Sequence, residues 1–223
     1  MSGRAAPCAG DADRGARETV VRDVIRGLYE GRYEPGQRLY EAQLTRIHGI
    51  SRGPVREALN KLAAMDIVEL TLQRGARVKV LRIDEALDTL VVVQELIALA
   101  ARLAALNIDR PGAREKMASV GRDLATFDPS SDGAEFALAR DSFYAALTEI
   151  AGNTQLKAML PVVRIHLIRV QFRAVLRATD ATKHKDYRRI AQAVLSGRPG
   201  EAEAAVLAHF ARAIEALRDF RGN

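Results

Sequence analysis

Residues Arg38 to Leu62, RLYEAQLTRIHGISRGPVREALNKL, carry the clearest structural pattern in the chain. Apolar residues recur at helical spacing on both sides of Gly49, a residue that suits a helix end with a positive φ. Ser51 can cap the second helix, because its hydroxyl can accept a hydrogen bond from a free backbone N–H. Pro54 fits the first turn of that helix, where its missing N–H costs nothing. The pattern predicts two short helices joined by a tight turn.

The second predicted helix has an apolar stripe and a cationic face. The stripe consists of Val55, Ala58, Leu59 and Leu62, and the residues off the stripe are Arg52, Arg56, Asn60 and Lys61. Together with the free amides of the helix start, this face suits an anionic partner, as in a helix-turn-helix. Two amphipathic helices around a glycine also occur in many all-α proteins, in which exposed arginines are only solvated. This stretch alone leaves both interpretations open.

A β-hairpin is predicted directly after this stretch. Residues 68–72, VELTL, form a β-like run, QRGA at 73–76 is a turn signal, and RVKVL at 77–81 alternates polar with apolar residues. An amphipathic helix over residues 18–30 precedes the helix-turn-helix. A helix, a helix-turn-helix and a basic hairpin make a winged helix, with Arg74 at the tip of its wing.

Four motifs in this region carry a family resemblance: PGQRL at 35–39, SRGPVREAL at 51–59, NKL at 60–62 and RGARV at 74–78. In this order and at these spacings, they resemble the DNA-binding domain of the GntR family of bacterial transcription regulators. The match spans about Thr19 to Leu81, and Gly53 stands where the most similar members have threonine. The residues that follow resemble the FadR-like subfamily, whose C-terminal module is called the FCD domain.

The resemblance implies that the second helix of the motif enters the major groove of DNA. Arg52, Arg56 and Asn60 would meet base edges, with Arg56 bidentate to guanine. Arg38 and Lys61 would hold phosphates, and the wing tip would reach the minor groove. The residues expected to contact DNA are Arg38, Ser51, Arg52, Arg56, Asn60, Lys61 and Arg74.

Composition and charge indicate a globular protein with a polyanionic partner. The 223 residues, 48% hydrophobic and 28% charged, suit one or two domains. The formal net charge is +6, and residues 18–82 hold twelve Lys/Arg against eight Asp/Glu. A basic excess of this size favours nucleic acid as a partner without proving it.

Cysteine usage and hydropathy predict a cytoplasmic protein. Cys8 is the only cysteine, so no intramolecular disulfide is expected. The first residues lack the apolar segment of a signal peptide. The most apolar stretch, 87–106, is interrupted by Gln94, Glu95 and Arg102, which predicts a buried helix rather than a membrane span.

The chain is expected to be mostly α-helical and to have three parts. Residues 1–17 predict a disordered tail, residues 18–82 a winged helix-turn-helix of three helices and a β-hairpin wing, and residues 83–223 an FCD-like domain for effector binding and dimerisation. In the last part, helices are predicted over 84–106, 112–125, 132–151, 153–179, 183–196 and 200–220. About six helices with short connections imply an antiparallel bundle.

The resemblance also points to a possible metal position in this bundle. FCD modules commonly bind a metal through Asp-x-x-Phe-His on one helix and a histidine on each of two later helices. Aligned on Phe143, the aspartate falls on Arg140, the first histidine on Tyr144, and the later histidines on Tyr187 and His209. A guanidinium, two phenols and one imidazole cannot replace that ligand set around a divalent cation. We therefore expect no metal and no other cofactor at this position.

An anionic small-molecule effector suits these side chains better than a metal. The guanidinium can pair with an anionic group, and the phenols and imidazoles can donate hydrogen bonds to it. A structural interpretation stays open for each residue, such as a surface arginine paired with Asp141 and tyrosines that only fill the core. The residues expected to bind the effector are Arg140, Tyr144, His166, Tyr187 and His209.

Taken together, the patterns predict a ligand-responsive transcription regulator, not an enzyme, that binds operator DNA as a homodimer. The alternative is a helical-bundle protein, either an enzyme or an interaction module, whose winged helix no longer binds DNA. For an enzyme, the candidate side chains are His166, His184 and His209 with Asp141 or Glu149. Their spacing matches no catalytic arrangement that we can justify.

Overall fold

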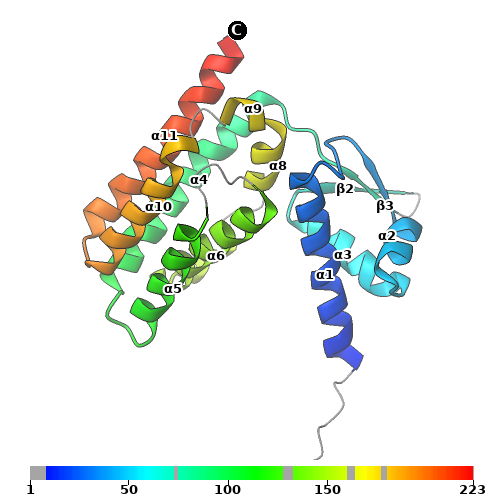
Figure 1. Ribbon diagram of the computed structural model, residues 1–223, viewed down its shortest axis with the longest axis horizontal. Helices are drawn as coiled ribbons and strands as arrows, with labels where there is room; N and C mark the ends of the chain where they lie inside the picture. Colours follow the sequence, from blue (N-terminus) through cyan, green and yellow to red (C-terminus); the bar gives the residue numbers. More distant parts are fainter. Residues whose placement is uncertain (1–8, 73–74, 128–132, 160–163, 177–179, 223) are drawn as a thin grey trace, which may run out of the picture. The chain divides into compact units, whose positions relative to one another are not determined.

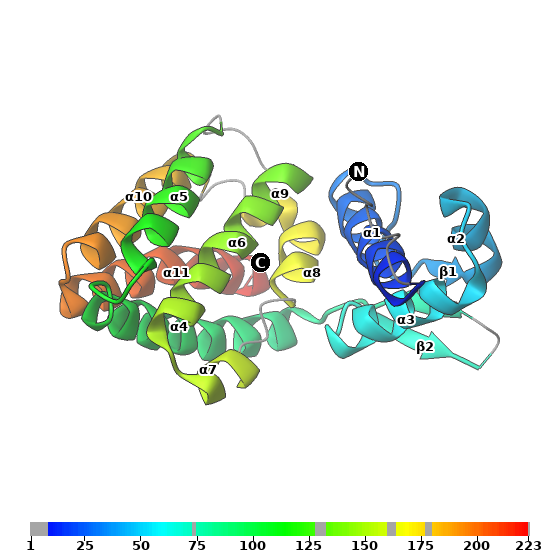
Figure 2. The ribbon, with the colours of Figure 1, turned by 90° about the horizontal axis from the view of Figure 1, so that it is seen from below.

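The computed structural model of the chain describes residues 9–72, 75–127, 133–159, 164–176 and 180–222. The chain divides into two compact units, Met1–Val80 and Leu81–Asn223. Among the described residues, the first unit combines helices with a small sheet, and the second is a bundle of helices (Figures 1 and 2). The predicted fold class, a winged helix-turn-helix followed by an all-α bundle, is confirmed.

The first unit is built on three helices and a three-stranded antiparallel sheet, within the part of the chain described. The helices are α1 (Ala9–Tyr29), α2 (Glu41–His48) and α3 (Arg52–Ala64), and the strands are β1 (Arg38–Tyr40), β2 (Val68–Thr71) and β3 (Gly75–Val78). The strand order is β1-β3-β2. Helix α1 packs along α3 (Figure 1), and the apolar stripe of α3 is buried, as its spacing predicts.

The prediction of a helix from Arg38 is wrong, because residues 38–40 form β1 and α2 starts at Glu41. Pairing with β3 begins just before the strand, where Val78 exchanges backbone hydrogen bonds with Gly36 and Gln37 at 2.9 and 2.8 Å. Gly75 permits the close approach, since a Cβ built there would lie 2.4 Å from the backbone oxygen of Leu39. The glycine of the RGARV motif is therefore a packing requirement of the sheet.

The predicted disordered tail is wrong for residues 9–17. Helix α1 begins at Ala9, nine residues before the predicted start, while residues 1–8 lie outside the described part of the chain. Residues 9–17 contain three alanines and no proline, which favours a helix. Arg17 lies 3.6 Å from Glu57, so the added turns of α1 also contact α3.

The second unit is an antiparallel bundle organised around one long helix. Its helices are α4 (Ile83–Leu106), α5 (Ala113–Ala125), α6 (Ala134–Ala151), α7 (Thr154–Met159), α8 (Arg164–Gln171), α9 (Arg173–Leu176), α10 (Asp180–Leu195) and α11 (Pro199–Gly222). Helix α4 packs against α11 and α6, and α10 packs against α11 and α5 (Figures 1 and 2). One face of α4 is fully buried through Val93, Ile97, Ala101 and Ala104.

The predicted single helix over 153–179 is wrong, because the chain forms the shorter helices α7, α8 and α9 there. Within the described residues, the interruption lies at Phe172, between the end of α8 and the start of α9. Helix α8 ends at Gln171, whose side-chain amide makes two hydrogen bonds with the backbone of Leu81. The Leu81 N–H donates to Oε1 at 2.9 Å, and Nε2 donates to the Leu81 carbonyl. This pair of bonds fixes the first residue of the bundle unit.

Among the described residues, α4 is long and apolar enough to cross a membrane by length and composition alone. Half of its most apolar window is buried inside the bundle. Such burial is typical of a core helix, which agrees with the sequence prediction for this stretch.

Candidate DNA-binding face and effector site

The turn between α2 and α3 has the geometry that its sequence predicts. Gly49 ends α2 in the left-handed region, at φ 63°, and its N–H donates to the carbonyl of Thr45. Ser51 occupies the N-cap position of α3, but among the described residues its side chain makes no capping hydrogen bond. Pro54 is buried in the first turn. The Ser51 hydroxyl is exposed and therefore remains available to a ligand.

Arg56 is held in place at the exposed face of α3. Its Nε lies 3.0 Å from Oε2 of Glu41, a buried carboxylate at the start of α2, while half of the Arg56 side chain is exposed. The contact uses Nε and leaves the terminal nitrogens to bind a partner. Arg52 and Asn60 are exposed on the same helix. The structure thus presents a fixed guanidinium between two exposed polar side chains.

The other residues predicted to contact DNA differ in their surroundings. Lys61 binds both carboxylate oxygens of Glu18 at 2.7 Å, which ties α3 to α1 and lowers the pKa of Glu18. This pairing does not favour the predicted phosphate contact of Lys61. Arg38 stacks over the ring of Tyr40 at 5.0 Å from its centroid. The predicted wing-tip residue, Arg74, lies outside the described residues.

The predicted effector residues of the bundle gather in two connected groups. In the first, Arg140 on α6 is 1% exposed, and its Nη2 lies 3.4 Å from Nδ1 of His166 on α8. Asp141 joins both, with Oδ2 2.8 Å from His166 Nε2 and Oδ1 3.6 Å from Arg140 Nη2. In this arrangement Nε2–H donates to the carboxylate and Nδ1 can accept from the guanidinium. Arg140 is thus paired with Asp141 inside the bundle, not on its surface.

The second group contains Tyr144, Tyr187 and His209. The two hydroxyls are 3.2 Å apart, and the rings of Tyr187 and His209 are 4.9 Å apart. His209 Nδ1 donates to Oδ2 of Asp186 at 3.0 Å, and Arg212 binds the same oxygen. All five predicted effector residues are buried, and the charge of Arg140 acts on both tyrosines.

Burial sets the protonation of this second group. It raises the pKa of Tyr144 well above its ordinary value and also raises that of Tyr187, so both phenols keep their protons at neutral pH. Burial lowers the pKa of His209. For Asp186, burial raises the pKa, but the hydrogen bonds from His209 and Arg212 outweigh it and lower the pKa overall. The site therefore offers protonated hydroxyls beside a neutral imidazole.

These side chains do not fit a divalent cation. The position of the expected aspartate holds a buried guanidinium, and burial keeps the two phenols protonated. The Nδ1 of His209 is already bound to Asp186. Within the described part of the chain, no three His, Cys, Asp or Glu side chains gather as a metal site would require.

Sequence reasoning missed Asp186 and Arg212, which form the charged partners of His209. Asp141, considered only as a surface partner of Arg140, also binds His166, and Arg169 acts electrostatically on both tyrosines and on His209. The available signal for Asp186 was proximity in the chain, since it directly precedes Tyr187. Of the enzyme candidates, His166 and Asp141 lie together at 2.8 Å, whereas Glu149 is exposed and paired with Lys116. The side chain of His184 lies outside the described residues.

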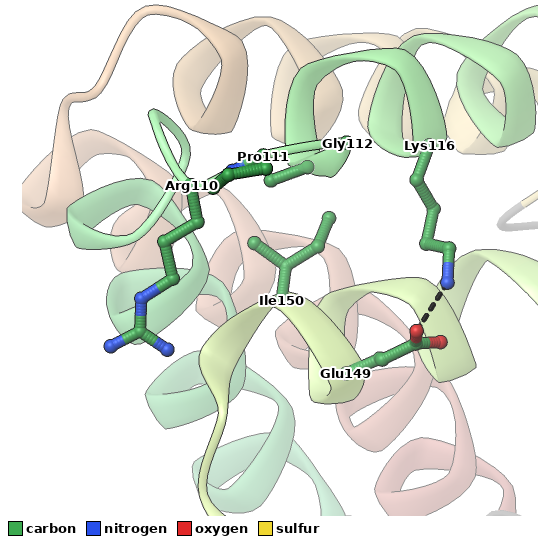
Figure 3. A pocket seen from close by; sticks show the side chains of 7 residues that line it. Arg110, Pro111, Gly112, Lys116, Glu149 and Ile150 are labelled. Carbon is green, nitrogen blue, oxygen red and sulfur yellow. Dashed lines mark hydrogen bonds and ion pairs between the residues drawn. The ribbon is translucent and has the colours of Figure 1, made fainter.

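A separate pocket of about 270 Å³ opens where α5 begins and α6 ends (Figure 3). Arg110 and Lys116 stand on opposite sides of it, and Ile150 lies between them (Figure 3). Lys116 is bound to Glu149 across the pocket. None of the predicted effector residues lines this pocket.

Comparison with known protein families identifies the class of protein. Residues 16–78 match the family described as bacterial regulatory proteins, gntR family, and residues 88–212 match the FCD domain. The chain belongs to the GntR family of transcription regulators and carries an FCD domain. It is accordingly a ligand-responsive transcription regulator, as its sequence motifs predict.

Individual relatives agree with this class. The chain is 26% identical over 203 residues to the probable D-xylose utilization operon transcriptional repressor of Paenarthrobacter nicotinovorans, covering 91% of this chain and 89% of that protein. It is 25% identical over 214 residues to the HTH-type transcriptional regulator LutR of Bacillus subtilis (strain 168), and the match covers 86% of this chain and 97% of LutR. Comparison with the structure of E. coli McbR/YncC gives a TM-score of 0.75 at 19% sequence identity, over 92% of this chain and 98% of that one. This similarity supports the fold.

Proposed function

We propose that this chain binds operator DNA as a homodimer and that an anionic small molecule in the bundle changes its affinity for the operator. The observation that carries the DNA-binding proposal is the exposed face of α3, with Arg56 fixed by Glu41 between Arg52 and Asn60. A prepositioned guanidinium suits bidentate binding to guanine in the major groove. Arg38 and Ser51 would contact the DNA backbone beside it.

The proposed effector site is the buried group of Arg140, Tyr144, His166, Tyr187 and His209. Its support is a guanidinium near protonated phenol and imidazole donors, which matches the needs of a carboxylate or phosphate. Asp141 now pairs with Arg140, so an anion would have to displace that carboxylate. Such a displacement changes contacts between α6 and α8 and gives effector binding a route to alter the bundle.

The experiment for this function is a gel-shift or fluorescence-anisotropy titration of the purified full-length chain with the DNA upstream of its own gene. We expect saturable binding that survives excess unrelated DNA, in a retarded complex of two protein chains. Binding no stronger than that to unrelated DNA of equal length would contradict the proposal and favour an interaction module. Because a bacterial transcription regulator must reach the chromosomal DNA, we infer that the protein is cytoplasmic.

We also propose that the bundle works without a metal. Metal analysis of purified protein is expected to find no stoichiometric zinc, nickel or manganese, because the residues at the metal position offer a guanidinium and protonated phenols. Treatment with a chelator should leave the melting temperature unchanged. One equivalent of metal that is lost on replacing His209 with alanine would overturn this expectation.

A further inference from the structure

Helix α4 carries a second apolar stripe on the face opposite its buried side. Val92 and Leu106 are 55% and 63% exposed, and Leu96, Leu99 and Leu103 are half-buried. These five residues are spaced by four, three, four and three positions along the helix. That spacing is the a/d pattern of a helix that packs against a partner helix. A continuous stripe of this kind marks an interaction surface, unlike isolated exposed leucines.

We infer that this stripe, Val92-Leu96-Leu99-Leu103-Leu106, is where α4 packs antiparallel against α4 of a second copy of the chain. The inference rests on the homodimer proposed above and names its contact surface. In an antiparallel pair with a twofold axis, an a position faces a d position of the partner. Leu96 then faces Leu99 of the second copy, and Val92 faces Leu103. The stripe is therefore complementary to itself over four apolar layers.

The charges beside the stripe favour the antiparallel direction. Glu95 and Arg102 each precede an a position, namely Leu96 and Leu103, and both are exposed. In the antiparallel register, Glu95 of one copy meets Arg102 of the other, and the twofold axis makes this ion pair twice. In a parallel pair, Glu95 would face Ala100 and Arg102 would face Asn107, and neither of these residues carries a charge.

Both charged side chains can exchange their present partners. Arg102 Nε lies 3.7 Å from Oε1 of Glu203, and Glu95 accepts a hydrogen bond from Gln94 at 3.3 Å. These contacts are at the surface, where ion pairs contribute little. A second copy can therefore take them over at small cost.

Disulfide trapping tests the register. In the full-length chain with Cys8→Ser, the double variant Val92→Cys/Leu103→Cys is expected to give a covalent dimer on mild oxidation, seen on a non-reducing gel. The two positions lie about 16 Å apart along one helix, so they cannot cross-link within a chain. Each single variant should stay uncross-linked. Efficient cross-linking by either single variant, or none by the double variant, would overturn the antiparallel seam.

Charge reversal tests the same seam without introducing cysteines. Glu95→Arg is expected to raise the dimer dissociation constant roughly tenfold in analytical ultracentrifugation, because two attractive contacts become repulsive. Adding Arg102→Glu should restore wild-type affinity, while circular dichroism confirms that each variant is folded. A wild-type dimer that is indifferent to Glu95→Arg would refute the seam alone. A wild-type monomer bound singly to DNA would refute the proposed homodimer itself.

Discussion

Replacing Asp141 with asparagine is expected to lower the free energy of unfolding of the bundle by about 3–5 kcal/mol, the usual cost of breaking a buried ion pair from one side. Arg140 is almost fully buried, and Asp141 places a carboxylate against it at 3.6 Å. Asparagine keeps the size of the side chain and an oxygen toward His166 but removes the negative charge. The buried guanidinium then loses this compensation for its desolvation. Urea denaturation followed by circular dichroism measures the loss.

The matched control is Arg140→Met, which is expected to cost less. It leaves Asp141 with its 2.8 Å contact to His166, and the Asp141 side chain is 26% exposed, so solvent screens the remaining charge. The double variant Asp141→Asn/Arg140→Met should recover at least half of the stability lost in Asp141→Asn alone, because it removes the buried cation. A loss below about 1 kcal/mol in Asp141→Asn would show that this carboxylate does not hold Arg140 in place.

The elements that the sequence predicts well are those encoded by local periodicity. Helix α3 and the turn at Gly49 follow from apolar spacing and glycine geometry within about fifteen residues. Strand β1 could not be predicted in this way, because three residues are too short to show alternation and their partner strand lies more than thirty positions later. The interruption at Phe172 in the predicted helix 153–179 has no neighbouring proline or glycine to mark it in the sequence.

For the bundle site, resemblance to a family pattern located the residues but not their pairing. Arg140, Tyr144, Tyr187 and His209 fall at aligned positions, and the structure brings them into one buried region. Which carboxylates bind Arg140 and His209 depends on how every helix is rotated about its axis. Asp141 is about 100° from Arg140 around α6, and this separation does not prevent its contact with the Arg140 guanidinium.

Replacing Arg56 with alanine is expected to weaken binding to the operator by about 1–3 kcal/mol, or roughly 5- to 150-fold, and to relax sequence preference at one base pair. The reason is geometric: Glu41 holds Nε of Arg56 at 3.0 Å, while half of the Arg56 side chain stays exposed on α3. Fluorescence anisotropy against the operator and against single-base variants measures both effects. Arg218→Ala on α11 removes the same charge from an exposed helix end and should leave the affinity within twofold.

A variant of Glu41, the partner of Arg56, distinguishes a role of this ion pair in DNA recognition from a purely structural role. Glu41→Gln keeps the Arg56 guanidinium but weakens its fixation, so a loss smaller than that of Arg56→Ala is expected, at the same base pair. The dependence of affinity on salt should stay unchanged in both variants, because a base contact releases no counterion. If Arg56→Ala instead weakens every sequence equally and lowers the salt slope by about one, Arg56 contacts a phosphate. The specificity of α3 would then have to come from Arg52 and Asn60.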